Sequence, residues 1–179
     1  MKNREPRRKV AGFSLMEVLM AMGLVAVLLG LAVPGVGAWR SRHELRAVAE
    51  DVWNSLILAR SQALVHQQRV VMCPVSSAGR CDVQGQWLQG WQVFVDSDRD
   101  GQRSTGELLL QSRGALPRAV RLQGNSTVSH GVRYGADGLG DGLSGTFSLC
   151  SMGTREGWRV IINVMGRARM EKVELQDCV

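Results

Sequence analysis

The feature that most constrains this chain is a single carboxylate at the start of a long apolar run. Glu17 follows a basic stretch at residues 1–11 and precedes Val18–Val33, which contains no charged side chain. A charge at the centre of a bilayer costs about 2.5–3.5 kcal/mol on insertion scales, and an acid in such a segment is a functional hypothesis by default. We therefore expect Glu17 to have a role of its own within a membrane segment.

Two common kinds of N-terminal segment fit this pattern only in part. A secretory signal is cleaved after its apolar core, where residues 32–38 offer only a weak site. A plain membrane anchor needs roughly 20 apolar residues, a length that this segment provides. Neither kind explains why the sequence Gly-Phe-Ser-Leu-Met-Glu, at residues 12–17, stands at the cytoplasmic edge of the run.

Residues 1–35 resemble the class III signal of type IV pilins and pseudopilins, with a basic leader, Gly12 before the cleaved bond, and Glu17 as the fifth mature residue. The resemblance implies that a prepilin peptidase cleaves between Gly12 and Phe13 and methylates the new amino terminus. It also implies that Glu17 pairs with the Phe13 amine of a neighbouring subunit, because a buried charge is tolerated when it has a partner. The alternative is a carboxylate that extends towards the lipid headgroups.

Charge places the rest of the chain outside the cytoplasm. The formal net charge is +6, and the leader carries +4 of it, which leaves about +2 for the mature chain. Basic residues stay on the cytoplasmic side of a membrane, so the head is expected beyond the inner membrane. We therefore expect four segments: a leader at 1–12, a transmembrane and assembly helix at 13–35, an amphipathic helix at 36–67 and a β-rich head at 68–179.

The spacing of apolar residues predicts an α+β fold, with a long N-terminal helix packed on antiparallel sheets, and the resemblance implies the pilin-like form of this fold. Between residues 41 and 66 one apolar stripe recurs at helical spacing, and it consists of Leu45, Val48, Val52, Leu56, Ala59 and Ala63. Pro34 predicts a kink between the membrane half and this amphipathic half. Eight β-like runs follow, separated by glycine-rich turns. These runs are Arg69–Cys73, Trp91–Val95, Glu107–Gln111, Ala119–Leu122, Gly131–Tyr134, Thr146–Cys150, Trp158–Val164 and Arg167–Leu175.

The head is similar to the FimT/GspH family of minor pilins and pseudopilins. The resemblance rests on Val-Met-Cys-Pro at 71–74, Trp87, the segment Gly-Trp-Gln-Val-Phe-Val-Asp at 90–96, and Gly-Arg-Ala-Arg at 166–169. It implies a subunit that assembles with other pilins or pseudopilins through its N-terminal helix. The sequence leaves open whether the machine is a type IV pilus or a type II secretion system.

Four cysteines in an exported head are expected to form disulfides. Their proximity in the sequence favours the pairs Cys73–Cys81 and Cys150–Cys178 among the three possible connectivities. A zinc site is the alternative, but the sequence contains no Cys-x-x-Cys and its three histidines are scattered.

The segment from Asp96 to Glu107 matches the EF-hand calcium loop at every ligand position. Asp96, Asp98 and Asp100 occupy positions one, three and five, a glycine occupies position six, and Glu107 occupies position twelve. The flanking runs are β-like rather than helical, so the alternative is a polar hairpin loop without metal. We expect no cofactor, and calcium bound by this loop is the alternative.

The motif Gly166-Arg167-Ala168-Arg169 is a candidate site for DNA. In an extended segment Arg167 and Arg169 point to one side, about 6–7 Å apart, and two guanidiniums so placed can grip backbone phosphates. Lys172 is a further candidate for the same patch. In FimT-type minor pilins this motif is associated with DNA capture, so the resemblance implies binding to extracellular double-stranded DNA. The alternative is a hairpin whose arginines are solvated or pair with Glu171 and Glu174.

No catalytic constellation is present in the sequence, and we expect a non-enzyme. The histidines lack a patterned nucleophile or carboxylate, and the tryptophans at 87, 91 and 158 are expected in the core rather than stacked on bases. The favoured function is that of a minor pilin, held in the inner membrane before it enters a type IV pilus, that also binds DNA. The rival is a GspH-like pseudopilin of a type II secretion system without DNA binding.

Overall fold

The computed structural model describes residues 14–140, 144–152 and 155–174, and within α1 it leaves out the side chains of 29–36 and 38. The chain divides into two compact units, Met1–Ala38 and Trp39–Val179. We call the second the head unit. Gly12, Phe13 and Cys178 lie outside the described residues.

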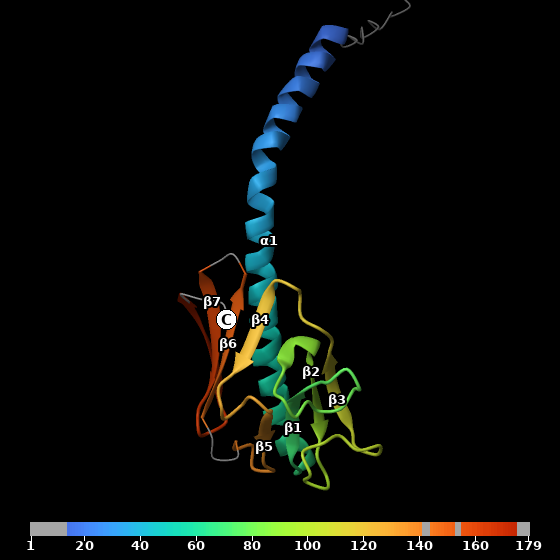
Figure 1. The fold of residues 1–179 in the computed structure, drawn as a ribbon, viewed down its shortest axis with the longest axis vertical. Coiled ribbons are helices and arrows are strands. Elements are labelled where there is room, and N and C mark those ends of the chain that lie inside the picture. Colours follow the sequence, from blue (N-terminus) through green and yellow to red (C-terminus); the bar gives the residue numbers. More distant parts are fainter. Residues whose placement is uncertain (1–13, 141–143, 153–154, 175–179) are drawn as a thin grey trace, which may run out of the picture. The chain divides into compact units, whose positions relative to one another are not determined.

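One helix, α1 (Leu15–His66), begins in the first unit and ends in the head unit (Figure 1). The two helical segments predicted on either side of Pro34 are therefore one continuous element. Ser14 precedes the helix and accepts a hydrogen bond through its Oγ from the Glu17 main-chain N–H, at 3.3 Å. Within the ranges that the structure describes, no helix combines the length and the apolar character that crossing a bilayer requires.

Eight strands form two antiparallel sheets in the head unit (Figure 1). The first sheet has the order β3-β2-β1-β5 and consists of β1 (Val70–Pro74), β2 (Trp91–Val95), β3 (Leu109–Arg113) and β5 (Val132–Tyr134). The second has the order β4-β6-β7-β8 and consists of β4 (Val120–Gly124), β6 (Gly145–Ser151), β7 (Glu156–Ile162) and β8 (Ala168–Glu174). A short 3-10 helix, η1 (Trp87–Gln89), precedes β2. Each predicted run corresponds to one strand, within two residues at either end, and the α+β class is confirmed.

The hydrophobic core is built between the stripe of α1 and both sheets. All six predicted stripe residues are buried, and they join inward-facing residues of the strands in one cluster. Trp87 and Trp91 are fully buried in this cluster and Trp158 packs against it, so the prediction that the tryptophans belong to the core is confirmed. All the clustered residues follow residue 38, so the head unit contains its own core.

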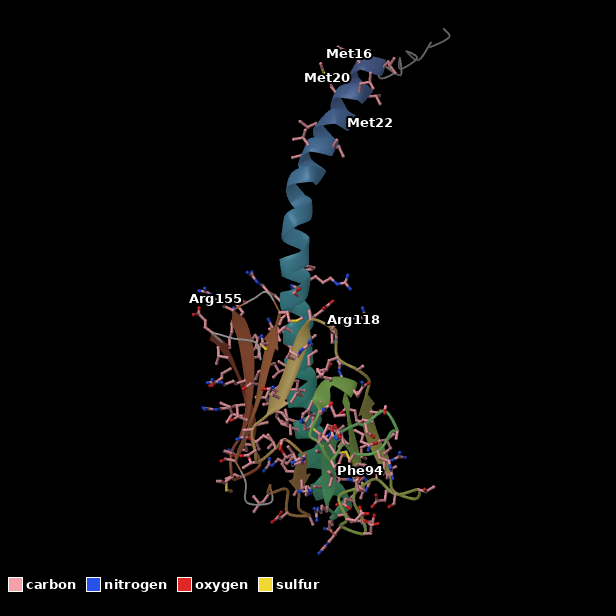
Figure 2. All side chains as sticks on the ribbon, in the orientation of Figure 1. Met16, Met20, Met22, Phe94, Arg118 and Arg155 are labelled. Carbon is pink, nitrogen blue, oxygen red and sulfur yellow. A yellow bond between two sulfur atoms is a disulfide. The ribbon has the colours of Figure 1, made fainter. Side chains whose placement is uncertain are left out.

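A second, smaller cluster covers the other face of the first sheet. Successive side chains of a strand alternate between faces, and Val71 and Cys73 of β1 accordingly point away from the main core. They pack with Cys81 and with Phe94 of β2, which is labelled in Figure 2. The first sheet is therefore buried on both faces around β1 and β2.

Polar contacts fix α1 against the first sheet at one level of the core. The Trp91 indole N–H donates to the hydroxyl of Ser55 at 2.9 Å, and both residues are buried. The Arg113 guanidinium pairs with Asp51 of α1 at 3.2 Å and lies over the Trp91 ring, 5.3 Å from its centre. These contacts give each of these polar groups a partner, which avoids the cost of leaving it unsatisfied.

Candidate functional site

The Gly-Arg-Ala-Arg motif lies on the turn between β7 and β8 and on the first residues of β8. The side chain of Asn163 organises this turn, because its Oδ1 accepts the main-chain N–H groups of Met165 at 3.1 Å and Arg167 at 2.9 Å. The Gly166 N–H also donates to the Asn163 carbonyl at 2.9 Å. The Asn163 N–H in turn donates to the Arg167 carbonyl at 3.1 Å, so four local hydrogen bonds hold the backbone that carries Arg167.

Gly166 is required at its position for two reasons. Its φ is +72°, a backbone angle that residues other than glycine rarely adopt. A Cβ at this position would also lie 2.9 Å from the Gly138 carbonyl oxygen and 2.9 Å from Cε1 of Tyr134. The turn therefore packs so closely on the loop after β5 that no side chain fits between them.

Arg167 and Arg169 both project into solvent, while Ala168 between them packs against the core. Among the described residues, no carboxylate lies within ion-pair distance of Arg167. Arg169 is 3.9 Å from Glu171, and its side chain is 72 % exposed. Such a long, exposed contact contributes little, so both guanidiniums are available to an external anion.

Lys172 does not lie with these arginines. It is an odd number of residues from Arg167 and Arg169 in an extended segment, so it projects from the opposite face of β8. There its ammonium pairs with Glu156 at 3.1 Å, beside Arg42 and Arg46 of α1. Our grouping of Lys172 with the motif is therefore wrong in its geometry.

Two further arginines, one in β7 and one just before it, lie at different distances from the motif. Arg159 is exposed on the outer face of β7, opposite Glu171 in the ladder and diagonal to Arg169. Arg155, labelled in Figure 2, precedes β7 and lies about 20 Å from the β7–β8 turn, given about 3.3 Å per strand residue. The outward arginine surface therefore consists of Arg167, Arg169 and Arg159.

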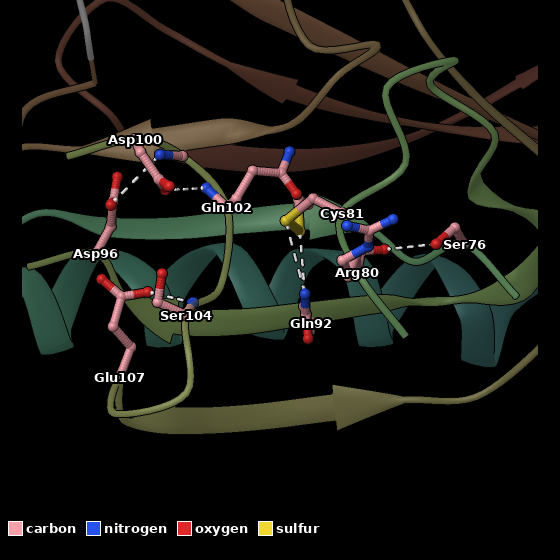
Figure 3. The surroundings of a disulfide bond; sticks show 11 residues. Ser76, Arg80, Cys81, Gln92, Asp96, Asp100, Gln102, Ser104 and Glu107 are labelled. Atoms are coloured by element: carbon pink, nitrogen blue, oxygen red, sulfur yellow. Dashed lines mark hydrogen bonds between the residues drawn. A yellow bond between two sulfur atoms is a disulfide. The ribbon is translucent and has the colours of Figure 1, made fainter. Parts of the chain in front are cut away.

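The EF-hand-like segment forms the loop between β2 and β3 (Figure 3). It brings three of the four predicted acids together. Oxygens of Asp96, Asp98 and Glu107 lie within 4.8 Å of one another. Asp100 is not in this group, and its carboxylate accepts the main-chain N–H of Gln102 at 2.6 Å. In a helix-flanked EF-hand loop, this spacing places five or more ligands around calcium. Between these two strands, the same spacing brings only three carboxylates together.

Existing donors already occupy part of this acidic group. Glu107 accepts the main-chain N–H groups of Ser97 at 2.7 Å and Ser104 at 2.9 Å. Asp96 is buried and pairs with Arg69 at 3.2 Å. Burial raises the pKa of the Asp96 carboxyl above its ordinary value, against the opposing effects of the Gly101 N–H and of Arg69. These contacts are of the kind expected in a polar hairpin loop, and calcium binding stays a prediction.

A disulfide joins Cys73, in β1, to Cys81 in the loop that follows (Figure 3). This predicted pair is confirmed. The amide of Gln92 in β2 lies 3.6 Å from both sulfur atoms. Cys150 in β6 is also disulfide-bonded, but Cys178 lies outside the described residues, so the pair Cys150–Cys178 stays a prediction.

Glu17 lies in the first turn of α1 and is exposed. A carboxylate at this place is favourable because it faces the positive end of the helix dipole. The contribution of Ser14 was not predicted, although Ser-x-x-Glu before an apolar run is a known helix-start pattern. Gly12 and Phe13, the predicted cleavage site, lie outside the described residues.

Comparisons with known proteins agree with this architecture. Residues 7–33 match the prokaryotic N-terminal methylation motif, and residues 48–166 match the family described as type II transport protein GspH. No curated protein matches the chain by sequence.

Three solved structures share the fold. Two crystal forms of the type IV minor pilin FimU of Pseudomonas aeruginosa align with TM-scores of 0.62 and 0.59, at 21 % and 20 % identity. They cover 79 % and 75 % of this chain and 99 % and 100 % of their own. The minor pseudopilin EPSH from the type II secretion system of Vibrio cholerae aligns with a TM-score of 0.50 at 11 % identity, over 74 % of this chain and 97 % of its own. With a methylation motif that overlaps the first part of α1 and a family match over residues 48–166, the chain belongs to the GspH family of minor pilins and pseudopilins.

Proposed function

We propose that this protein is a minor pilin of a type IV pilus. The carrying observation is the methylation motif at residues 7–33, followed by a head unit with the fold of the FimU minor pilin. In this proposal a prepilin peptidase cleaves between Gly12 and Phe13, and the apolar segment holds the subunit in the inner membrane until assembly. Glu17 then pairs with the Phe13 amine of a neighbouring subunit.

The proposal includes binding of extracellular double-stranded DNA through Arg167 and Arg169. Both side chains are exposed on one side of a turn whose backbone is fixed by Asn163. Guanidinium groups bind phosphate through charge-assisted, often bidentate, hydrogen bonds. Contacts to phosphate carry no base information, so the binding is expected to be independent of sequence and to weaken with salt. No catalytic step is part of this function.

The head unit, residues 39–179, is the suitable material for testing DNA binding because it contains its own core. Fluorescence anisotropy with a labelled duplex is expected to give a dissociation constant of about 1 μM or weaker at physiological salt. The double variant Arg167→Gln/Arg169→Gln should lose binding. Lys172→Gln is the matched control, since it removes one positive charge from the opposite face of β8. Equal binding by the wild type and the double variant would refute the DNA role.

A second candidate is a pseudopilin of a type II secretion system, without DNA binding. It is favoured by the description of the matching family and by the likeness to EPSH. Deleting the gene separates the two machines: loss of pili indicates the first function, and loss of protein secretion indicates the second. If the protein is a pseudopilin, cells that carry the Arg167→Gln/Arg169→Gln variant should secrete protein like the wild type.

A further inference from the structure

Arg60 of α1 lies beside the arginine motif, although 106 residues separate it from Gly166 in the sequence. A surface cavity of about 490 Å³ lies between the helix and the β7–β8 turn, and Arg60 and Arg167 both line it. The rest of the lining comes from Ile57, Ser61, Leu64, Gly166 and Ala168. All these residues belong to the head unit, so the cavity is a feature of one compact body.

A single carbonyl joins Arg60 to the motif. The Nε of Arg60 donates to the carbonyl oxygen of Gly138 at 2.9 Å. The same oxygen is one of the atoms against which Gly166 packs, because a Cβ on Gly166 would lie 2.9 Å from it. Gly138 therefore sets the position of the Arg60 guanidinium and of the β7–β8 turn together. This arrangement fixes Arg60 relative to Arg167 without direct contact between two like charges.

The charges at this cavity are not neutralised by acids. Within the described part of the chain, neither Arg60 nor Arg167 has a carboxylate within ion-pair distance, and Arg60 uses only its Nε in the hydrogen bond to Gly138. Elsewhere on α1 the arginines are paired, as in Arg46 with Glu50 at 2.8 Å. The two terminal nitrogens of Arg60, like the whole guanidinium of Arg167, can therefore donate to an external anion.

We propose that Arg60 is a third phosphate-binding residue of the DNA site. The DNA backbone then crosses from Arg169 and Arg167 on the β7–β8 turn to Arg60 on α1. Ile57, Leu64 and Ala168 provide an apolar floor for the deoxyribose between successive phosphates. This inference rests on the proposed DNA binding and extends its site from a two-arginine motif to a surface made by strand and helix.

The test compares Arg60→Gln with Arg46→Gln in the head unit, using duplex DNA and fluorescence anisotropy. Both variants remove one arginine from α1, but only Arg60 lines the cavity. Arg60→Gln is expected to weaken binding about tenfold and to lower the slope of log affinity against log salt by about one, as loss of one phosphate contact does. Arg46→Gln should leave both quantities unchanged, and Arg60→Lys should keep the salt slope.

The outcomes separate the inference from the function on which it rests. If Arg60→Gln binds DNA like the wild type while Arg167→Gln/Arg169→Gln does not bind, the inference is wrong and the DNA role stands. If Arg60→Gln weakens binding with an unchanged salt slope, Arg60 only positions the turn, and the inference is also wrong. If the wild type and all variants bind alike, the DNA role itself is lost.

Discussion

The indole Nε1 of Trp53 in α1 donates a hydrogen bond to the main-chain carbonyl of Ala168 in β8, at 3.1 Å. Ala168 is the residue between the two arginines of the motif. The bond therefore ties the residue between the two arginines to the helix, while both arginine side chains stay exposed. A part-buried tryptophan 115 residues away in the sequence thus holds the backbone that carries them.

Replacing Trp53 by phenylalanine should destabilise the head unit by about 1 kcal/mol, the typical net contribution of one hydrogen bond. Most of the aromatic contact with the core is kept in this variant. Urea denaturation of the head unit measures the change in the free energy of unfolding. Trp39→Phe is the control, since Trp39 is 62 % exposed and outside the core. Equal stability of the two variants would contradict a role for the bond.

Replacing Gly166 by alanine should cost stability and reduce DNA binding, because the new Cβ would displace the turn from Gly138. Gly79→Ala is a well-matched control: Gly79 has a φ of +76°, close to that of Gly166, but nothing lies within 4 Å of the place that a Cβ would occupy. Both variants incur the strain of a positive φ, of order 1–3 kcal/mol. Only Gly166→Ala is expected to weaken DNA binding, and equal binding by both variants would show that the turn tolerates the shift.

The β2–β3 loop should bind calcium weakly if at all, with a dissociation constant in the millimolar range of extracellular modules. Only three carboxylates converge there, and Arg69 already pairs with one of them. Isothermal titration of the head unit tests this, with Asp98→Ala as the control variant. A submicromolar dissociation constant would contradict the weak calcium binding expected here. If millimolar calcium produced no heat, the loop would be a turn that binds no calcium.

The raised pKa of Asp96 predicts the direction in which the free energy of unfolding changes with pH. A carboxyl whose pKa is higher in the folded than in the unfolded chain binds its proton more tightly when folded. Its stabilising effect is therefore complete below the unfolded pKa and is lost as pH rises through the folded pKa. The comparison is between wild type and Asp96→Asn, by urea denaturation with a chelator present. The wild-type advantage should fall with rising pH in the acidic range. An advantage that grows instead would mean that the Arg69 charge outweighs burial.

The mature protein should begin at Phe13 and carry a methylated amino group. Gly12 and Phe13 lie between the basic stretch and the apolar run, and residues 7–33 match the methylation motif. Mass spectrometry of the protein from its native membrane or fibre decides the point. A mature start near Trp39 would indicate an ordinary secretory signal and would remove the basis of the pilin proposal.

Much of the fold was predictable because it depends on local periodicity. The buried stripe of α1 follows from side chains at three- and four-residue spacing, and the eight strands follow from apolar runs between glycine-rich turns. The Cys73–Cys81 pair was predictable from its short separation. The division of the strands between two sheets was not, since pairing of β1 with β5 and of β4 with β6 depends on the common core.

The site was predictable only along one strand. Alternation places Arg167 and Arg169 on one side, and the same rule, applied three residues further, places Lys172 on the other. The signal for that correction was therefore present in the sequence. The position of Arg60 was not, because it depends on the carbonyl of Gly138, which contacts both the helix and the β7–β8 turn. A main-chain acceptor has no sequence signature.

Strand β8 lies at the edge of its sheet, and it carries charged side chains at Arg169, Glu171, Lys172 and Glu174. An edge strand exposes unpaired backbone groups to which another chain can add, and charges along it oppose such addition. One edge of the other sheet is β5, which has only three residues. At these two edges, copies of this head are thereby hindered from joining their sheets through backbone hydrogen bonds. Contact there is left to side chains, and side-chain contacts can separate again.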